Sequence, residues 1–283
     1  ESRNVFAANA TFGRYSLYTH NQNPCSQEFQ AVGDLGASFR YVGGLYYFKE
    51  HVKEDAETRL TNQCNADGTG YTIRSAYGTP PYNTSTLGGW QPGTQFVARA
   101  SHGDATSYAV FAQGTYTPAA FDKLHLTVGG RYTNDKRSGV LYAVNGKAAN
   151  FPFSLSAGRI DPLANLAYDL TDTVNLYAKY STGYRAGGAN ARSSTFAAFA
   201  AEEVKAYEIG AKMDLMDRRL RVNLAAYAMD RSNSQIDFDS VDLVVGSPTQ
   251  GSHTENTTNA SGVSHIKGVE VDITGKVTDE VTV

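Results

Sequence analysis

The stretch "LHLTVGGRYTND", Leu124 to Asp135, decides the fold class of this chain. Every second side chain from Leu124 to Tyr132 is apolar or glycine, and the residues between them include His125, Thr127 and Arg131. Side chains two positions apart share one face of a β-strand, so the stretch predicts a strand with an apolar and a polar face. Such an apolar face can meet either a protein core or lipid.

Composition narrows the classes of protein that need to be considered. The chain has 283 residues, a net charge of -3 and no basic block, so nucleic acid is not an expected partner. It has no run of about 18 apolar residues and therefore no predicted membrane-spanning helix. Its mean hydropathy of -0.38 is typical of soluble proteins. Membrane β-barrels also give low averages, because their lipid-facing residues alternate with polar ones.

The alternating pattern recurs along the chain, with short turns and long polar stretches between the runs. The runs are Ser38–Val52, Thr106–Pro118, Leu124–Asp135, Pro162–Leu170, Val174–Gly188, Glu202–Met216, Leu220–Phe238 and Ser264–Val277. They predict about nine or ten antiparallel strands in up-and-down order, with the long loops at one end. This layout is typical of outer-membrane barrels, whereas a soluble sandwich distributes its long connections less regularly.

Two features bear on this prediction. The segment "FAAFAAEEVKAYEIGAKMDL" is rich in Ala, Glu and Lys, which favours a helix, but strict alternation from Tyr207 to Leu215 and a turn at Asp217 favour a strand. The polar faces mix Arg, Glu, Asp and Asn with Gly and Tyr, which suits a water-filled lumen. The apolar faces carry small and medium residues, which lipid tolerates. A transmembrane barrel is therefore favoured over a soluble sheet.

The residues that could carry chemistry are sparse. Cys25 and Cys64 are not in a CxxC pair, and they are either two unrelated thiols or one disulfide. The six histidines have no metal-ligand spacing, and no Ser/His/Asp set has a recognisable spacing. We therefore expect no metal, no cofactor and no enzymatic activity.

Several phrases resemble successive barrel hairpins of TonB-dependent outer-membrane receptors. They are "LTVGGRYTNDK" (Leu126–Lys136), "NLYAKYSTGYRAGGAN" (Asn175–Asn190), the run Glu202–Ile236, "NASGVSHIKGVEVDI" (Asn259–Ile273), and the earlier pair Ser26–Gly33 with Tyr41–Glu50. Their order and spacing also match, and the resemblance covers nearly the whole chain.

The resemblance implies a 22-stranded barrel in the outer membrane of a Gram-negative bacterium, closed by an N-terminal plug domain. It implies uptake of a scarce nutrient, such as an iron–siderophore complex, cobalamin or an oligosaccharide, driven by an inner-membrane complex of the TonB–ExbB–ExbD type. Other implied partners are the receptor's own plug, the lipid bilayer and lipopolysaccharide. Neither the plug, nor the N-terminal energy-coupling box, nor the last strands are recognisable, so residues 1–283 are expected to be an internal part of the barrel.

Candidate substrate contacts fall into two groups. Charged residues on the polar faces form a lumen network that pins the wall to the plug, or else touch substrate: Glu28, Arg131, Arg185, Glu208, Arg221 and Glu270. Aromatic residues in the first long loop could grip sugar rings or aromatic chelators, or could pack the loop: Tyr71, Tyr77, Tyr82 and Trp90. The expected extracellular loops are Lys53–Pro92, Ala143–Arg159, Ala189–Ala201 and Asp239–Asn259.

Three alternatives to the receptor interpretation remain. A passive porin or smaller barrel would keep the alternation without an upstream plug. A soluble all-β module, for example one that binds carbohydrate, would pack its apolar faces together. A barrel enzyme would need a nucleophile–base pair, which no spacing in the sequence supports.

Overall fold

The computed structural model describes residues 2–4, 14–60, 63–64, 71–72, 97–144, 147–193, 195–241, 253–278 and 280–283. Ten strands form one antiparallel sheet, in which each strand lies beside the next along the chain. They are β1 (Ser2–Asn4), β2 (Arg14–Leu35), β3 (Phe39–Leu60), β6 (Val97–Tyr116), β7 (Leu124–Val144), β8 (Lys147–Thr171), β9 (Val174–Arg185), β12 (Glu202–Leu215), β13 (Leu220–Ser232) and β16 (Val263–Gly275). The predicted all-β, up-and-down architecture is confirmed.

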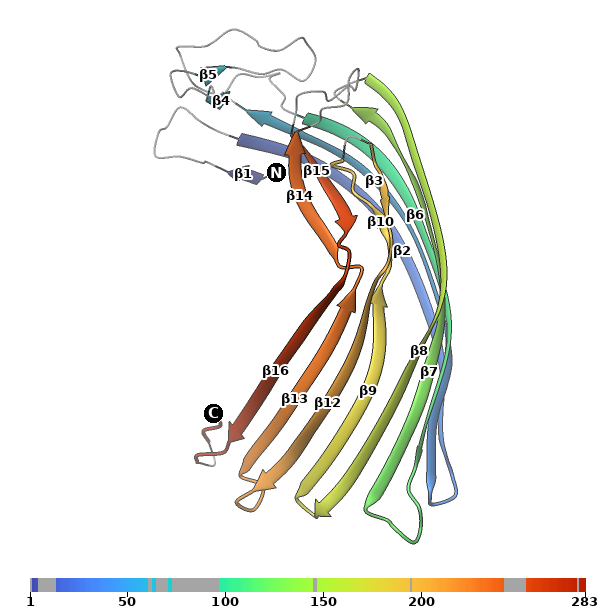
Figure 1. The fold of residues 1–283 in the computed structure, drawn as a ribbon, viewed down its shortest axis with the longest axis vertical. Helices are drawn as coiled ribbons and strands as arrows, with labels where there is room; N and C mark the ends of the chain where they lie inside the picture. The colour runs from blue at the N-terminus through green and yellow to red at the C-terminus, as the bar shows by residue number, and fades with distance from the viewer. Residues whose placement is uncertain are drawn as a thin grey trace.

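Three short strand pairs lie outside this sheet. They are β4 (Gln63–Cys64) with β5 (Tyr71–Thr72), β10 (Gly188–Ala189) with β11 (Ala198–Phe199), and β14 (Gln235–Val241) with β15 (His253–Asn259). Figure 1 shows the main sheet bent into an open curve, with tight turns at its lower end and the longer connections at its upper end. The β14–β15 hairpin lies beyond the upper ends of β13 and β16.

The two faces of the sheet follow the predicted alternation. Val128 is 67% exposed, whereas the neighbouring Thr127 is half-buried and bonds Thr115 through its hydroxyl at 2.8 Å. Cross-strand pairing joins the apolar side chains into rows, one of which reads Phe29, Leu45, Val110, Tyr132 and Ile160. All five are exposed, so the convex side presents an apolar band that no described residue covers.

The segment with two competing predictions is a strand. Residues 202–215 form β12, which pairs with β9 on one side and β13 on the other. The turn that follows has positive φ angles at Met216, Asp217 and Arg218, which confirms the turn predicted at Asp217. Pairing with a strand on each side thus outweighs the helical propensity of the Ala, Glu and Lys residues.

Glycines let aromatic rings lie flat across the sheet. Gly210 stands opposite Tyr177, and a Cβ at Gly210 would lie 2.5 Å from the Tyr177 hydroxyl and 2.5 Å from the backbone oxygen of Leu224. Gly268 stands opposite Tyr227 in the same way. Such pairs cover the glycine backbone and fix the register of neighbouring strands.

The strands are longer at the upper end than the sequence predicts. The expected loop Ala143–Arg159 is wrong, since Ala143 and Val144 belong to β7 and residues 147–159 belong to β8. The first part of the expected loop Lys53–Pro92 is also wrong, since β3 continues to Leu60. The outer parts of Asp239–Asn259 belong to β14 and β15.

Prolines explain part of this error. The strand patterns are interrupted by Pro24, Pro152 and Pro162. Proline has no backbone N–H to donate to a β-ladder, so it favours the prediction of a loop. In the structure each lies where its strand pairs with only one neighbour: β1 covers β2 only at Arg14–Ser16, and β9 covers β8 only from Leu163 onward. A proline at such an edge costs little, because its missing N–H can face the unpaired side.

Candidate functional site

The sheet forks where β8 and β9 separate. The two strands pair from Thr171 opposite Val174 to Leu163 opposite Ser181, whereas the pairing of β8 with β7 continues to Lys147. Above the fork, β9 stays with β12 and leans away from β8 (Figure 1). The fork therefore opens a gap in the wall at the end with the long connections.

Side chains from both arms of the fork meet in this gap. By alternation from Tyr180, residues Thr182 and Tyr184 would continue the outer face of β9. Instead Thr182 donates to Asp161 at 2.8 Å, and Tyr184 donates to Asp135. Both acceptors stand on the inner faces of β8 and β7, so the lean of β9 has turned its outer face toward the inner face of its neighbours.

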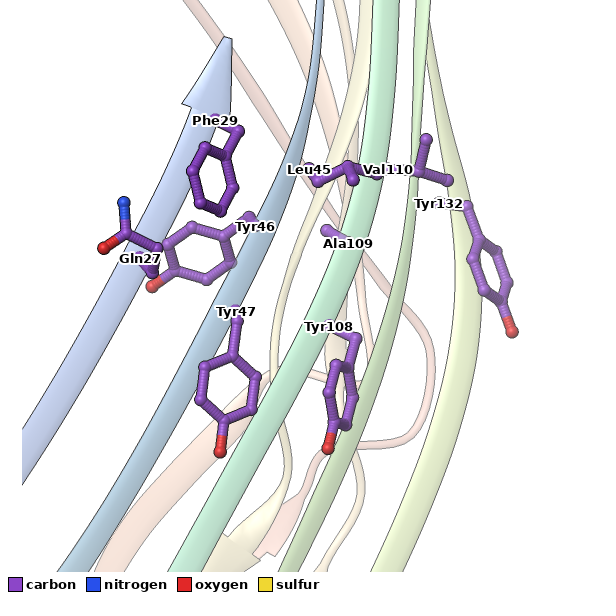
Figure 2. A pocket seen from close by; sticks show the side chains of 9 residues that line it. All are labelled: Gln27, Phe29, Leu45, Tyr46, Tyr47, Tyr108, Ala109, Val110 and Tyr132. Carbon is purple, nitrogen blue, oxygen red and sulfur yellow. The ribbon is translucent and has the colours of Figure 1, made fainter.

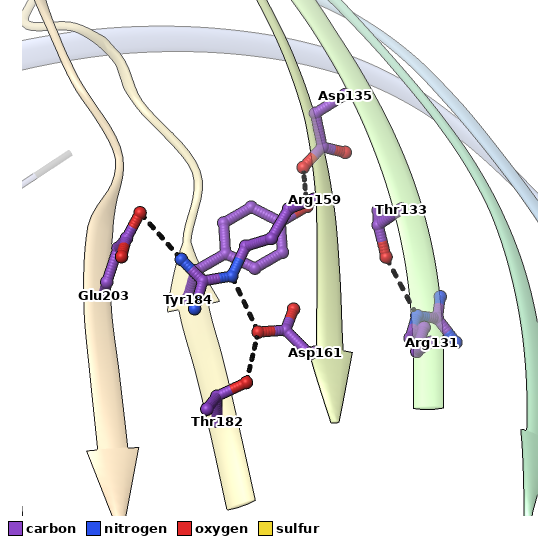
Figure 3. A network of polar contacts seen from close by, with 8 residues as sticks. All are labelled: Arg131, Thr133, Asp135, Arg159, Asp161, Thr182, Tyr184 and Glu203. Carbon is purple, nitrogen blue, oxygen red and sulfur yellow. Dashed lines mark hydrogen bonds and ion pairs between the residues drawn. The ribbon is translucent and has the colours of Figure 1, made fainter. Parts of the chain in front are cut away.

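Arg159 is the centre of the polar network in the fork (Figure 3). Its Nε donates to Asp161 at 2.7 Å, its Nη1 lies 2.8 Å from Glu203, and its guanidinium lies 5.4 Å from the ring centre of Tyr184. The side chains of Arg159 and Asp161 are only 17% and 12% exposed. Removing one partner would leave a largely buried charge unpaired, which is the costly way to break an ion pair.

The connection from β9 to β12 folds back onto the extended part of β7 and β8. Phe196, which is 4% exposed, packs with Leu141 and Val144 in a small apolar cluster and meets Phe153 edge-on at 5.2 Å between ring centres. Leu141 and Phe153 belong to the inner face, so the connection covers this face rather than extending into solvent.

Polar bonds tie the same connection to the β14–β15 hairpin. Ser193 donates to Asn256 at 2.8 Å, and Asn190 donates to Thr257 at 3.1 Å. The backbone N–H of Ala200 donates to the Asn259 side chain at 2.7 Å. Two segments about 60 residues apart in the chain thus form one polar unit.

A polar pocket of about 300 Å³ lies within this unit. Its lining residues come from the end of β9, the following connection and the β14–β15 hairpin: Arg185, Asn190, Arg192, Phe199, Gln235, Asp237, Glu255 and Thr257. Arg192 donates to Glu255 at 2.8 Å, and this hydrogen bond raises the pKa of Arg192. Both carboxylates of the lining are engaged, Glu255 by Arg192 and Asp237 by the Thr257 hydroxyl, so the remaining guanidinium and amide donors suit a ligand with oxygen acceptors.

The predicted lumen residues do not gather in one place. Arg185 lines the polar pocket. Arg131 lies 5.1 Å from the ring centre of Tyr46 and donates to Thr133 at 3.2 Å. Glu208 accepts a bond of 2.7 Å from the Tyr177 hydroxyl.

Three further candidates lie at the lower end or at the edge of the sheet. Arg221 pairs with Asp214 at 2.8 Å and lines a second polar pocket of about 350 Å³ beside the short turns. Glu270 is exposed on β16, opposite Ala225. Glu28 on β2 accepts a bond from Gln30. The predicted substrate role of all these residues stays a prediction.

The aromatic loop candidates lie outside the described residues at Tyr77, Tyr82 and Trp90, and the same holds for the side chain of Tyr71. Cys25 is a free, exposed cysteine in the structure, and its disulfide with Cys64 stays a prediction. The description does not extend to the Cys64 side chain.

The central residues of the fork and of the pocket are not among the residues predicted from the sequence. Arg159 and Asp161 fell at a loop boundary, and Arg192 and Glu255 fell inside polar stretches with no periodicity. The spacing R-x-D at residues 159–161 is the only local signal, since two side chains two apart on a strand share a face.

Two further features are absent from the described part of the chain. It contains no cluster of three or more His, Cys, Asp or Glu side chains that could hold a metal ion. It also contains no helix long and apolar enough to cross a membrane.

Comparison with known proteins is consistent across sequence and structure. The family model "TonB dependent receptor-like, beta-barrel" matches residues 2–281. The chain is 28% identical over 161 residues to the ferric-pyoverdine 358 receptor of Pseudomonas putida, covering 55% of this chain and 18% of that protein. It is 32% identical over 123 residues to the ferripyoverdine receptor of Pseudomonas aeruginosa, covering 42% and 14%.

The fold also matches a solved structure. The ferric yersiniabactin uptake receptor FyuA of Yersinia pestis superposes with a TM-score of 0.63 at 17% identity, covering 96% of this chain and 35% of that one. At this identity the likeness concerns the fold alone. The chain spans less than a fifth of the length of the two curated relatives.

Proposed function

The chain belongs to the TonB-dependent receptors, and from this membership we propose that it is a stretch of barrel wall in a receptor that imports a ferric siderophore. The family consists of receptors and transporters rather than enzymes. The match of the family model over residues 2–281 is the observation that carries the proposal. The two curated relatives, both named as receptors of ferric pyoverdines, favour an iron chelate over cobalamin or an oligosaccharide.

The structure supports a division of the wall into two surfaces. The exposed apolar rows on the convex side suit the lipid of the outer membrane, and the polar concave side suits a lumen that holds a plug domain. Beside the short turns, Arg221 and Asp214 line a polar pocket on the inner face, where a plug would make its contacts. Energy would reach such a plug from an inner-membrane complex of the TonB–ExbB–ExbD type.

The upper polar pocket is the proposed substrate contact of this segment. Ferric chelates present carboxylate, carbonyl and hydroxyl oxygens at their surface, which the guanidinium groups of Arg185 and Arg192 can bind. Arg192 is already held by Glu255, so Arg185 is the residue whose donors we assign to the ligand.

The test uses the full-length receptor in its own bacterium under iron limitation. A strain that lacks the receptor should lose uptake of radiolabelled iron from one ferric siderophore, and the intact receptor should stop transporting when the membrane potential is collapsed. Energy-independent uptake would instead indicate a passive channel. A protein that stays soluble after cell fractionation would contradict the membrane assignment altogether.

The pocket is tested separately with the purified receptor. Replacing Arg185 by Ala removes charge-assisted hydrogen bonds, so we expect ligand affinity to fall roughly tenfold. Arg40→Ala, which removes an exposed arginine paired with Asp34 at the opposite end of the sheet, is the matched control and should leave affinity within twofold. Equal effects of the two variants would contradict the assignment of the pocket.

A further inference from the structure

The register of β9 and β12 predicts an ion pair that the structure does not contain. Arg185, the last residue of β9, stands directly opposite Glu202, the first residue of β12. Opposite residues on antiparallel neighbours share one face, with Cβ atoms about 5 Å apart, so opposite charges at these positions are expected to pair. No described residue forms an ion pair with Arg185, and its exposed side chain lines the upper polar pocket instead.

The carboxylate of Glu202 is held by other partners. The backbone N–H of Gln235 donates to Glu202 Oε2 at 2.8 Å, and Arg231 Nη1 lies 3.9 Å from Oε1. The Glu202 side chain is only 16% exposed, so a lost partner would have to be replaced by another donor or cation nearby. Both oxygens are thus engaged away from Arg185, whose guanidinium stays available.

The side chain of Gln235 fixes its own backbone N–H beside Glu202. Its Nε2 donates to the carbonyl oxygens of Ala186 at 3.1 Å and Ala200 at 3.0 Å. Ala186 follows Arg185 directly, and Ala200 precedes Glu202 by two residues. One amide therefore ties the first residue of β14 to both ends of the β9–β12 connection.

Asn259 doubles this attachment from the opposite position in the β14–β15 hairpin. Its side chain accepts a bond of 2.7 Å from the Ala200 N–H and donates to the Ala200 carbonyl at 3.0 Å. It also donates at 2.8 Å to the carbonyl of Asn233, which has a φ of 53° at the bend between β13 and β14. The side chains of Gln235 and Asn259, here called the amide clasp, thus hold the hairpin where the chain bends.

We propose that the amide clasp keeps Arg185 unpaired for an anionic oxygen group of the ligand, by holding Glu202 on the Gln235 N–H. Gln235 is then a positioning residue of the pocket. Without the clasp the hairpin shifts, the N–H leaves Glu202, and the carboxylate turns to the arginine opposite it and competes with the ligand. The role of Arg185 as a ligand contact rests on the proposed function, whereas the hold on Glu202 does not.

The first test needs no ligand. Phenylglyoxal modifies arginine more slowly when a carboxylate holds the guanidinium, and mass spectrometry of the full-length receptor in detergent reads the rate at Arg185 against that at Arg40. Gln235→Leu should lower the rate at Arg185 about fivefold, the factor that corresponds to the net free energy of one hydrogen bond. The control Gln27→Leu removes an exposed glutamine from the convex face and should leave the rate unchanged (Figure 2).

A second substitution separates positioning from general loosening. Glu202→Gln in the Gln235→Leu background removes the competing charge, so the rate at Arg185 should return to within about twofold of the parent. An unchanged rate in Gln235→Leu, or a lowered rate that Glu202→Gln does not restore, would overturn the proposal. A heat-shifted gel band shows that each variant forms a closed barrel, and Asn259→Leu tests the same prediction if Gln235→Leu does not.

The same variants are then compared for binding of the ferric siderophore identified by the uptake assay. Its affinity should fall about fivefold in Gln235→Leu and recover when Glu202→Gln is added. Affinity that stays at the parent level in Gln235→Leu, while labelling of Arg185 falls, would overturn the assignment of Arg185 to the ligand. A parent receptor that binds no ferric siderophore would contradict the proposed function, and the labelling of Arg185 would still decide whether the clasp holds Glu202.

Discussion

The wall below the fork and the wall above it obey different rules. Below the fork, cross-strand rows such as Tyr116, Leu126 and Leu166 carry apolar residues from strand to strand, and alternation alone tells which side each residue faces. Above the fork, Tyr184 should face outward by alternation but donates to the inner-facing Asp135. Alternation along a strand predicts which side of the sheet a residue faces only where that strand is paired with a strand on each side.

The largest effect is expected for a charge placed on the lower wall. Val128→Arg puts a cation on the exposed apolar side of β7, one row further from the short turns than Leu126, so it should cost about 2–4 kcal/mol of unfolding free energy. Denaturant unfolding of the full receptor in lipid vesicles measures this cost. Thr127→Arg points the same charge inward and loses only a hydroxyl bond to Thr115, about 1 kcal/mol. Equal costs would break the assignment of the two faces.

A loss nearly as large, but local, is expected above the fork. Phe196→Ala removes the ring that packs on Leu141 and Phe153, so it should weaken docking of the β9–β12 connection by up to about 3 kcal/mol. Limited proteolysis should then cut near Phe196 at least tenfold faster, while the heat-shifted gel band stays unchanged. Loss of the heat-shifted band would mean that the connection and the wall fold as one unit. The contrast between the two regions would then be weaker than proposed.

A moderate effect is expected where an aromatic ring covers a glycine. Gly210→Ala would bring a Cβ to 2.5 Å from the Leu224 backbone oxygen, so backbone and ring must shift at a cost of about 1–3 kcal/mol. Gly130→Ala serves as its control, because its Cβ would meet only the Asp161 backbone oxygen, at an ordinary 3.9 Å. The denaturant midpoints of the two variants measure this cost. A midpoint for Gly210→Ala equal to that of the parent would contradict the expected loss of stability.

The smallest effect is expected at the open side of the fork network. The Glu203 side chain is 45% exposed, so Glu203→Gln should cost less than about 1 kcal/mol. Asp161→Asn should cost more, because Asp161 is mostly buried and bonds both Arg159 and Thr182. Unfolding midpoints measured side by side would contradict this ranking if Glu203→Gln proved the more damaging.

The sequence predicted the lower wall well and the upper wall poorly. Alternation in Leu124–Tyr132 and in Tyr207–Leu215 gave the strands and their faces, because both stretches keep two neighbours in the sheet. The sequence predicts a loop at residues 147–159, because Pro152 and several small polar residues hide a strand that pairs on one side only. Of the proposed pocket, only Arg185 was among the predicted residues.

By itself, the sequence determined the all-β class, the up-and-down order, the two faces and the resemblance to a receptor family. Those features follow from local period and from spacing along the chain. Only the tertiary structure decided where β8 and β9 part, how Phe196 covers the inner face, and which residues surround the polar pocket. These depend on contacts between segments tens of residues apart, such as Arg192 with Glu255, and no local pattern encodes the lean of one strand away from its neighbour.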